Sequence, residues 1–293
     1  MNILLFGANG QLGTKLRDLL AAKGSVRAVD QDGLDLRDGV QLRALIRESQ
    51  PALIVNAAAY TAVDQAESDA ENARLVNAEA PRIMAECARE RQALLVHYSS
   101  DYVFDGTASE PYCETSATHP LGVYGTTKLA GEQAVAASGA DYLTLRTAWL
   151  YSNHGKNFLN TMLRLAAERD ELRVVDDQTG SPTWSDLVAT ATLKMLDGLY
   201  ANGAVRRERC GLYHVTCNGQ TTWRGFASRI IELGGYGRRV RVTPITTAEY
   251  PTPAKRPVYS VLSNARLAQV FGLRLPDWQA GLQQCLAERS ARG

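Results

Sequence analysis

Tyr124 and Lys128 lie four residues apart in the sequence. Side chains with this spacing share one face of a helix. A phenol has a reference pKa of about 10, and a cation within about 4–6 Å favours its ionised form. We therefore expect Lys128 to lower the pKa of Tyr124, which would make the pair a usable proton donor and acceptor near neutral pH.

A hydroxyl that could act with this pair belongs to Ser100, which lies 24 residues before Tyr124. Ser100 follows the apolar run Leu94–Tyr98, which has the composition of a buried strand. Ligands of doubly wound sheets bind beyond the carboxyl ends of the strands. Ser100 could therefore hydrogen-bond a substrate carbonyl oxygen, or it could simply cap a turn.

Three glycines, Gly7, Gly10 and Gly13, separate the apolar run Ile3–Phe6 from the amphipathic stretch Gln11–Lys23. Glycines allow a tight turn, and the free N–H groups and positive dipole end of the following helix attract a pyrophosphate. The spacing GxxGxxG could also serve any turn from a strand to a helix. An acid after the next strand favours the dinucleotide interpretation.

That acid is Asp30, directly after the strand candidate Val26–Val29. An acid at this position accepts hydrogen bonds from the adenosine ribose and favours NAD, although a solvated loop residue is the plain alternative. Arg27 could instead receive a 2′-phosphate, so the sequence leaves both NADH and NADPH open. Asp35 and Leu36 could flank the adenine.

Short apolar runs alternate with helical patterns through the first half of the chain. This alternation predicts an α/β fold with a Rossmann-type, doubly wound parallel sheet over residues 1–150, the dinucleotide-binding domain. For residues 151–293 we expect a smaller C-terminal α/β substrate-binding domain, some segments of which could return to the first sheet. The expected strands are Ile3–Phe6, Val26–Val29, Ala52–Val55, Leu94–Tyr98, Tyr142–Arg146 and Gly211–Val215, and Pro81 predicts a kink or two abutting helices.

The composition excludes several classes of protein. The 293 residues carry 32 basic and 31 acidic side chains, so no excess charge points to nucleic acid or to a membrane surface. No apolar run reaches the roughly 18–20 residues of a membrane helix, and the N-terminus lacks the pattern of a signal peptide, so we expect a cytoplasmic protein.

The five widely spaced cysteines predict free thiols. The four histidines show no metal-ligand spacing, so we assign no metal site; a need for Mg²⁺ stays open, and a homodimer is permitted.

Several longer stretches of the sequence, taken together, support the interpretation as a dinucleotide-dependent enzyme. They are Met1–Gly13, residues 55–64, His97–Phe104, Pro120–Glu132, Arg146–Trp149, residues 177–183 and residues 250–257. In combination they resemble the extended short-chain dehydrogenase/reductase family along the whole chain.

The resemblance implies a role for each matching residue. Ser100, Tyr124 and Lys128 would be catalytic, with Ser100 standing where the family usually has threonine. Ser100, Asp101 and Trp149 would touch the substrate, although Trp149 could also be a core aromatic. The cofactor would be held by Gly7, Gly10, Gln11, Leu12, Gly13, Asp30, Asp35, Leu36, Ala59, Tyr60, Thr61, Tyr124 and Lys128.

The implied activity is reduction of the ketone of a dTDP-sugar by NADPH or NADH, with Tyr124 as the general acid. A sister epimerase or reductase is one alternative. A dehydratase usually has Asp-Glu after the catalytic hydroxyl residue, whereas this chain has Asp101-Tyr102. A third alternative is a non-catalytic, NADP-binding regulatory subunit resembling that of methionine adenosyltransferase. Arg256, on a proline-rich loop, could grip a diphosphate or be plain surface.

Overall fold

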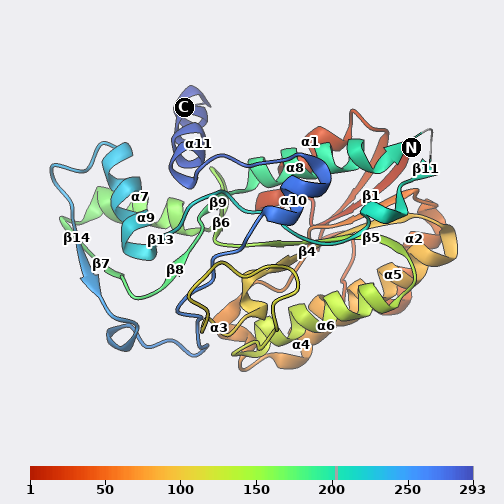
Figure 1. The fold of residues 1–293 in the computed structure, drawn as a ribbon, viewed down its shortest axis with the longest axis horizontal. Coiled ribbons are helices and arrows are strands. Elements are labelled where there is room, and N and C mark those ends of the chain that lie inside the picture. Colours follow the sequence, from red (N-terminus) through yellow and green to blue (C-terminus); the bar gives the residue numbers. More distant parts are fainter. Residues whose placement is uncertain (202–203, 293) are drawn as a thin grey trace.

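The computed structural model describes residues 1–201 and 204–292 and is built around one parallel sheet (Figure 1). Six strands are hydrogen-bonded in the order β12-β5-β4-β3-β1-β2, and each neighbouring pair is parallel. This order confirms the predicted Rossmann-type sheet. The strands are β1 (Asn2–Phe6), β2 (Ser25–Val29), β3 (Leu53–Asn56), β4 (Leu94–Ser100), β5 (Asp141–Thr147) and β12 (Gly211–His214).

The central strands are apolar because both faces of the sheet are covered. All residues of β3 and β4 are buried, and so are four of the five residues of β1. Such continuous apolar runs are typical of parallel sheets that helices cover on both sides. The edge strand β2 is more exposed.

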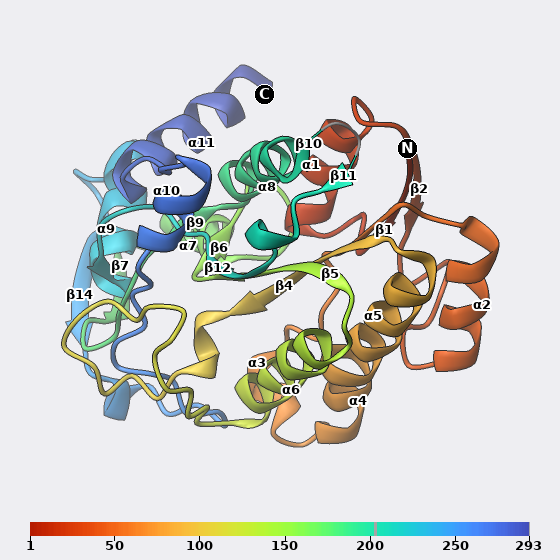
Figure 2. The same cartoon turned by 45° about the vertical axis from the view of Figure 1, so that its right-hand side comes forward.

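Helices cover the two faces of the sheet (Figures 1 and 2). On one face α1 packs against α8, and on the other α5 packs against both α2 and α6. The helices of these two layers are α1 (Gln11–Leu20), α8 (Ser185–Leu199), α2 (Gly39–Ser49), α5 (Ala80–Arg91) and α6 (Val123–Ala137), with the short α3 (Val63–Ala66) and α4 (Ala70–Arg74) beside α6.

The region around Pro81 confirms the predicted pair of abutting helical segments. A π-helical turn, Leu75–Glu79, leads directly into α5. Pro81 lies in the first turn of α5, at the junction with the π-helical turn, where the N–H of Ala80 donates to the carbonyl oxygen of Leu75.

Later segments form a second core at the end of the molecule where α7, α9, β7 and β14 lie (Figure 1). Its elements are α7 (Phe158–Glu168), α9 (Trp223–Leu233), α11 (Trp278–Arg292), β6 (Leu150–Tyr151), β7 (Glu171–Val175), β8 (Thr179–Gly180), β9 (Thr183–Trp184), β13 (Thr221–Thr222) and β14 (Arg241–Ile245). The short strands pair as β14-β7, β13-β8 and β6-β9.

The chain passes repeatedly between the core of the large sheet and this second core. Strand β12 joins the large sheet beside β5, as expected for a returning segment, and α8 and α10 (Ala265–Phe271) also pack on that side. The strands β10 (Tyr200–Ala201) and β11 (Ala204–Val205) form a small hairpin after α8. Membership changes from one core to the other near residues 148, 186 and 216, between Val242 and Leu267, and near residue 277, which makes five passages. The division at residue 150 stays a prediction.

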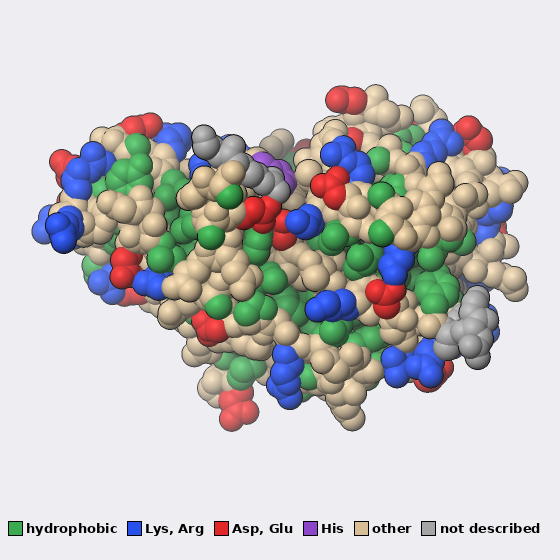
Figure 3. Space-filling view, turned by 90° about the horizontal axis from the view of Figure 1, so that it is seen from above, with side chains coloured by type: hydrophobic (Ala, Val, Ile, Leu, Met, Phe, Trp, Pro, Cys, Tyr) green, Lys and Arg blue, Asp and Glu red, His purple; other side chains and the backbone are tan. Residues whose placement is uncertain are grey.

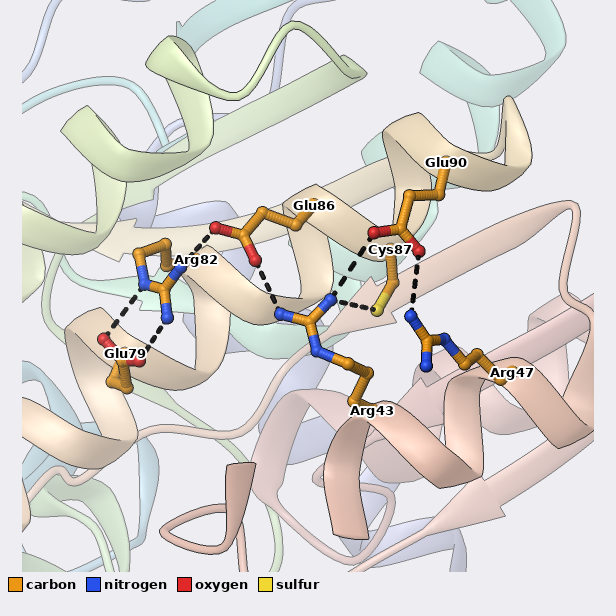
Figure 4. Close-up of polar contacts among 7 residues, drawn as sticks. All are labelled: Arg43, Arg47, Glu79, Arg82, Glu86, Cys87 and Glu90. Carbon is orange, nitrogen blue, oxygen red and sulfur yellow. Dashed lines mark hydrogen bonds and ion pairs between the residues drawn. The ribbon is translucent and has the colours of Figure 1, made fainter. Parts of the chain in front are cut away.

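Ion pairs link α2 to α5 on the surface (Figure 4). Arg43 of α2 contacts Glu86 of α5 at 2.6 Å, and Glu86 also pairs with Arg82. Elsewhere Lys and Arg side chains are interspersed with Asp and Glu side chains over one face of the molecule (Figure 3). Within the described part of the chain, none of the helices is both long and apolar enough to cross a bilayer.

Candidate active site

A cavity of ≈ 810 Å³ opens beyond the carboxyl ends of β1, β3, β4 and β5. The strand order reverses between β1 and β3, which is where open α/β sheets bind their ligands. With the exception of Gly13, all predicted site residues line this cavity: Gly7, Gly10, Gln11, Leu12, Asp30, Asp35, Leu36, Ala59, Tyr60, Thr61, Ser100, Asp101, Tyr124, Lys128 and Trp149. The structure thus brings the predicted set together, while the role of each residue stays a prediction.

The glycine turn is packed too tightly for side chains at two of its positions. Gly7 has φ +75°, and a Cβ there would lie 2.6 Å from the backbone nitrogen of Ala58. A Cβ on Gly13 would lie 1.9 Å from the carbonyl oxygen of Gly7, so Gly13 supports the turn from beneath rather than facing the cavity. Gly10 is the N-cap of α1 and supplies no side-chain acceptor, which leaves the first N–H groups of the helix for a ligand.

Two acidic side chains of the cavity wall, Asp30 and Asp35, are held by hydrogen bonds. The Asp30 carboxylate accepts hydrogen bonds from the backbone nitrogens of Asn9 (2.6 Å) and Gln31 (2.7 Å), which hold it beside the glycine turn. Hydrogen bonding to Arg37 lowers the pKa of Asp35, and Arg37 itself lines the cavity.

Arg27, the expected alternative partner of a 2′-phosphate, pairs with Glu48 at 3.2 Å. It is not among the residues that line the cavity. Arg37 lines the cavity instead, and its guanidinium is already engaged by Asp35 at 2.6 Å.

Tyr124 lies in the first turn of α6 with its ring against Tyr102, edge to face, at 5.4 Å between centroids. Burial raises the pKa of Tyr124 to about 12, and the negative charge of Asp101 acts in the same direction. A hydrogen bond with Ser100 lowers the pKa but does not outweigh burial. The phenol therefore keeps its proton throughout the neutral range.

Lys128 is buried one helical turn further along α6, with 2% of its surface exposed. Its ammonium donates a hydrogen bond of 2.6 Å to the carbonyl oxygen of Tyr98. Burial lowers the pKa of Lys128 to about 8, against the opposing effect of Glu132. The predicted lowering of the Tyr124 pKa by Lys128 is wrong, because desolvation of the phenol dominates and the ammonium binds the backbone of β4.

Ser100 caps a turn, one of the two interpretations left open by the sequence, while its hydrogen bond to a substrate carbonyl stays a prediction. Its hydroxyl accepts a hydrogen bond from the backbone nitrogen of Tyr102 (3.2 Å), which caps a short 3₁₀ turn, and it also meets the phenol of Tyr124. The Ser100 hydroxyl proton is directed to Asp101 Oδ1 at 2.8 Å. Burial raises the pKa of Asp101 to about 6, while hydrogen bonds with Ser260 and Ser100 lower it.

Trp149 lines the cavity directly after β5 and adopts φ +46°. This left-handed conformation costs a residue other than glycine roughly 1–2 kcal/mol. Its ring stacks on Trp223 with 3.6 Å between centroids and 5° between planes. Trp149 is therefore both a cavity residue and part of the second core, so the two interpretations of this residue are not exclusive.

The sequence did not indicate several further residues of the cavity wall. Trp223, His154 and Lys156 reach it from the second half of the chain. Among the described residues, the hydroxyls of Ser99 and Thr147 and Nε2 of His154 are buried without a hydrogen-bond partner. Ser99 and Thr147 could have been found from their places at the ends of β4 and β5, whereas no local pattern marks the other three.

These features fit a bound dinucleotide. The free helix N-terminus suits a pyrophosphate, Asp30 suits ribose hydroxyls, and the unpartnered hydroxyls at the strand ends have hydrogen bonds to offer. Arg256 instead pairs with Asp64 at 2.8 Å and does not line the cavity. Over residues 1–201 and 204–292, no group of three or more His, Cys, Asp or Glu side chains could hold a metal ion.

Comparison with known proteins matches this chain to one family over almost its full length. Residues 1–291 match the RmlD substrate binding domain. A protein of Burkholderia thailandensis named dTDP-4-dehydrorhamnose reductase is 46% identical over 294 residues, which cover 98% of this chain and 99% of that protein.

Solved structures of proteins with the same name are also similar to this chain. A dTDP-4-dehydrorhamnose reductase from Clostridium acetobutylicum has a TM-score of 0.92 at 40% identity, covering 99% of this chain and 100% of that chain. One from Bacillus anthracis, in complex with NADP, has a TM-score of 0.88 at 36% identity, with 98% of both chains covered. The resemblance to extended short-chain dehydrogenases/reductases is thereby confirmed, and the chain belongs to the RmlD substrate binding domain family, the family of the dTDP-4-dehydrorhamnose reductases.

Proposed function

We propose that this protein reduces dTDP-4-dehydro-β-L-rhamnose to dTDP-L-rhamnose with NADPH or NADH, the last step of dTDP-L-rhamnose synthesis. The observation that carries the proposal is the single cavity that joins a dinucleotide-binding turn to the protonated phenol of Tyr124. The names of the relatives and the NADP bound to the Bacillus anthracis relative support the substrate and the cofactor class.

When bound, the reduced nicotinamide supplies a hydride, which forms the new C–H bond at C4 of the sugar. The cofactor is thereby oxidised. Tyr124 donates its proton to the C4 oxygen, so hydride and proton together convert the ketone to an alcohol. A phenol whose pKa burial raises to about 12 is fully protonated at neutral pH and ready to donate. The resulting phenolate regains a proton from solvent before the next cycle.

Ser100 and Lys128 prepare this transfer. The Ser100 hydroxyl lies between the phenol and Asp101 and orients the phenol; to stabilise the developing oxyanion, it would turn its proton from Asp101 Oδ1 toward the substrate oxygen. One hydrogen of the Lys128 ammonium is used by Tyr98, and the other two remain for the hydroxyls of a cofactor ribose.

A spectrophotometric assay with dTDP-4-dehydro-L-rhamnose and each reduced cofactor tests the proposal. We expect oxidation of the cofactor, and we expect Tyr124→Phe to lower kcat by about 10²–10⁴-fold, the range that general acid catalysis contributes. Near-normal turnover in that folded variant would remove Tyr124 from the mechanism. Interconversion of sugar epimers without net cofactor consumption would indicate an epimerase, and binding without turnover would indicate a regulatory subunit.

A further inference from the structure

Two tryptophans from distant parts of the chain form one stacked pair in the cavity wall. Trp149 follows β5, and Trp223 is the first residue of α9. Their rings are almost parallel, at 5°, with 3.6 Å between centroids. Trp223 is itself held in place, because its indole N–H donates to Oε1 of Gln178 (3.2 Å) and the ring of Phe158 packs on it at 4.6 Å.

The opposite face of Trp149 is covered by backbone. A Cβ built on Gly180 would lie 2.3 Å from Cε2, 2.5 Å from Nε1 and 2.7 Å from Cζ2 of Trp149. Cε2 is bonded to both Nε1 and Cζ2, and it is the nearest of the three atoms to this Cβ. The Cβ would therefore lie above the ring plane and not beyond the ring edge. The indole is therefore enclosed between Gly180 and Trp223.

This enclosure determines which part of the indole a ligand can meet. Trp223 covers one face of the indole and Gly180 covers the other face around Cε2, which leaves the ring edge as the freest part of Trp149 for a ligand in the cavity. The edge of an aromatic ring is electropositive and suits oxygen atoms, whereas the covered faces are the surfaces on which a sugar or a base would stack. The indole N–H of Trp149 has no hydrogen-bond partner in the described ranges 1–201 and 204–292.

Trp149 follows the strand that lies beside Ser100, where the reacting carbonyl is expected. Ser100 and Thr147 are paired neighbours across β4 and β5, and Trp149 follows Thr147 by two residues. The left-handed backbone of Trp149 is a conformation that persists only where the surroundings impose it. The stack with Trp223 is one such restraint.

We propose that Trp223 is a positioning residue for the sugar of the substrate: it stacks on Trp149 and fixes the Trp149 edge against the oxygens of the sugar ring near Ser100. This inference rests on the proposed function, since it names the sugar end of the same substrate. The dTDP part of the substrate and the dinucleotide do not depend on Trp223.

The test compares Trp223→Ala with Trp223→Phe. For Trp223→Ala we expect the KM for dTDP-4-dehydro-L-rhamnose to rise about ten-fold, the scale of one aromatic pair, with a smaller change in kcat. The KM for NADPH and the Kd for dTDP alone, measured by calorimetry, should stay unchanged, because neither reports on the sugar. Trp223→Phe keeps an aromatic face against Trp149 and should restore most of the lost affinity. Trp278→Phe, in the second core and away from the cavity, is the matched control.

The two proposals fail in different ways. Wild-type protein that does not oxidise the cofactor with this substrate would overturn the proposed function. Wild-type turnover together with an unchanged KM in Trp223→Ala, or an equal loss of affinity for dTDP, would overturn the role of Trp223. If Trp223→Ala does not fold, Gly180→Ala is the second test, because its added methyl group would push Trp149 from the other face. The proposal requires that this variant also raises the KM for dTDP-4-dehydro-L-rhamnose. An unchanged KM in Gly180→Ala would contradict the proposal.

Discussion

Lys128 places an ammonium in the interior of the protein, and we expect its replacement by methionine to stabilise the ligand-free fold at neutral pH. Burial lowers its pKa from 10.5 to about 8. Between these two values the unfolded chain binds more protons at this position than the folded chain, so the stability of the wild type rises with pH across that window. Below about pH 8 the folded protein carries the full cost of the buried charge.

The size of the effect follows from the same shift. A difference of 2.5 between the two pKa values corresponds to about 3 kcal/mol, at about 1.36 kcal/mol for each unit. Methionine loses the hydrogen bond to the carbonyl oxygen of Tyr98, which is worth about 1 kcal/mol. We therefore expect Lys128→Met to raise the free energy of unfolding by about 2 kcal/mol at pH 7, and to lower it by about 1 kcal/mol above pH 10.5, where the lysine is neutral in both states.

Urea unfolding of both proteins across this pH range, followed by tryptophan fluorescence, measures the difference directly. Other groups titrate in the same window, but they are common to both proteins and cancel. Lys194→Met, at an exposed position of α8, controls for the loss of one lysine from the chain. A Lys128→Met protein that is less stable than wild type at pH 7, or a difference that does not change sign with pH, would refute the reasoning. Activity should fall in any case, because the variant cannot hold the hydroxyls of a cofactor ribose.

Two further predictions concern the cofactor end and the surface. Asp30→Ser should raise the ratio of kcat/KM for NADPH to kcat/KM for NADH by about ten-fold or more, because a carboxylate at this position accepts from ribose hydroxyls and repels a 2′-phosphate; an unchanged ratio would show that Asp30 does not face the ribose. Glu86→Gln should lower the free energy of unfolding by up to about 1 kcal/mol at neutral pH, since Glu86 pairs with Arg43 and Arg82. Hydrogen bonding to Arg43 lowers the pKa of Glu86, so this stabilisation is present above the unfolded pKa of 4.5 and is lost as the pH falls through the lower folded value. A difference that persists in strong acid or grows with added salt would contradict it.

The large sheet and most of its site could be predicted because the relevant signals are local. Strands covered on both faces are continuous apolar runs, and the glycine spacing after β1 follows from close packing at Gly7 and Gly13. Once the strands are known, the rule that ligands bind beyond their carboxyl ends places Asp30 and Ser100 at the same edge of the sheet, around one cavity.

Effects that depend on the tertiary environment could not be predicted in this way. The spacing of Tyr124 and Lys128 correctly places them on one helix face, but it does not reveal that the ammonium binds Tyr98 or that desolvation dominates the phenol. The partner of Trp149 is equally hidden, because α9 reaches Trp149 only through the folding of the second core. The division near residue 150 has the same difficulty, since β12 returns to the first sheet as an ordinary short strand.

The five passages between the two cores have a consequence for engineering this protein. The part that would recognise the sugar is not a module with one entry and one exit, so grafting it from a relative requires compatible junctions at all five places. A single proteolytic nick would leave the two parts joined by the remaining connections. Chimeras should therefore succeed when they exchange individual loops around Trp149 or His154, and fail when one fusion point is chosen in the middle of the chain.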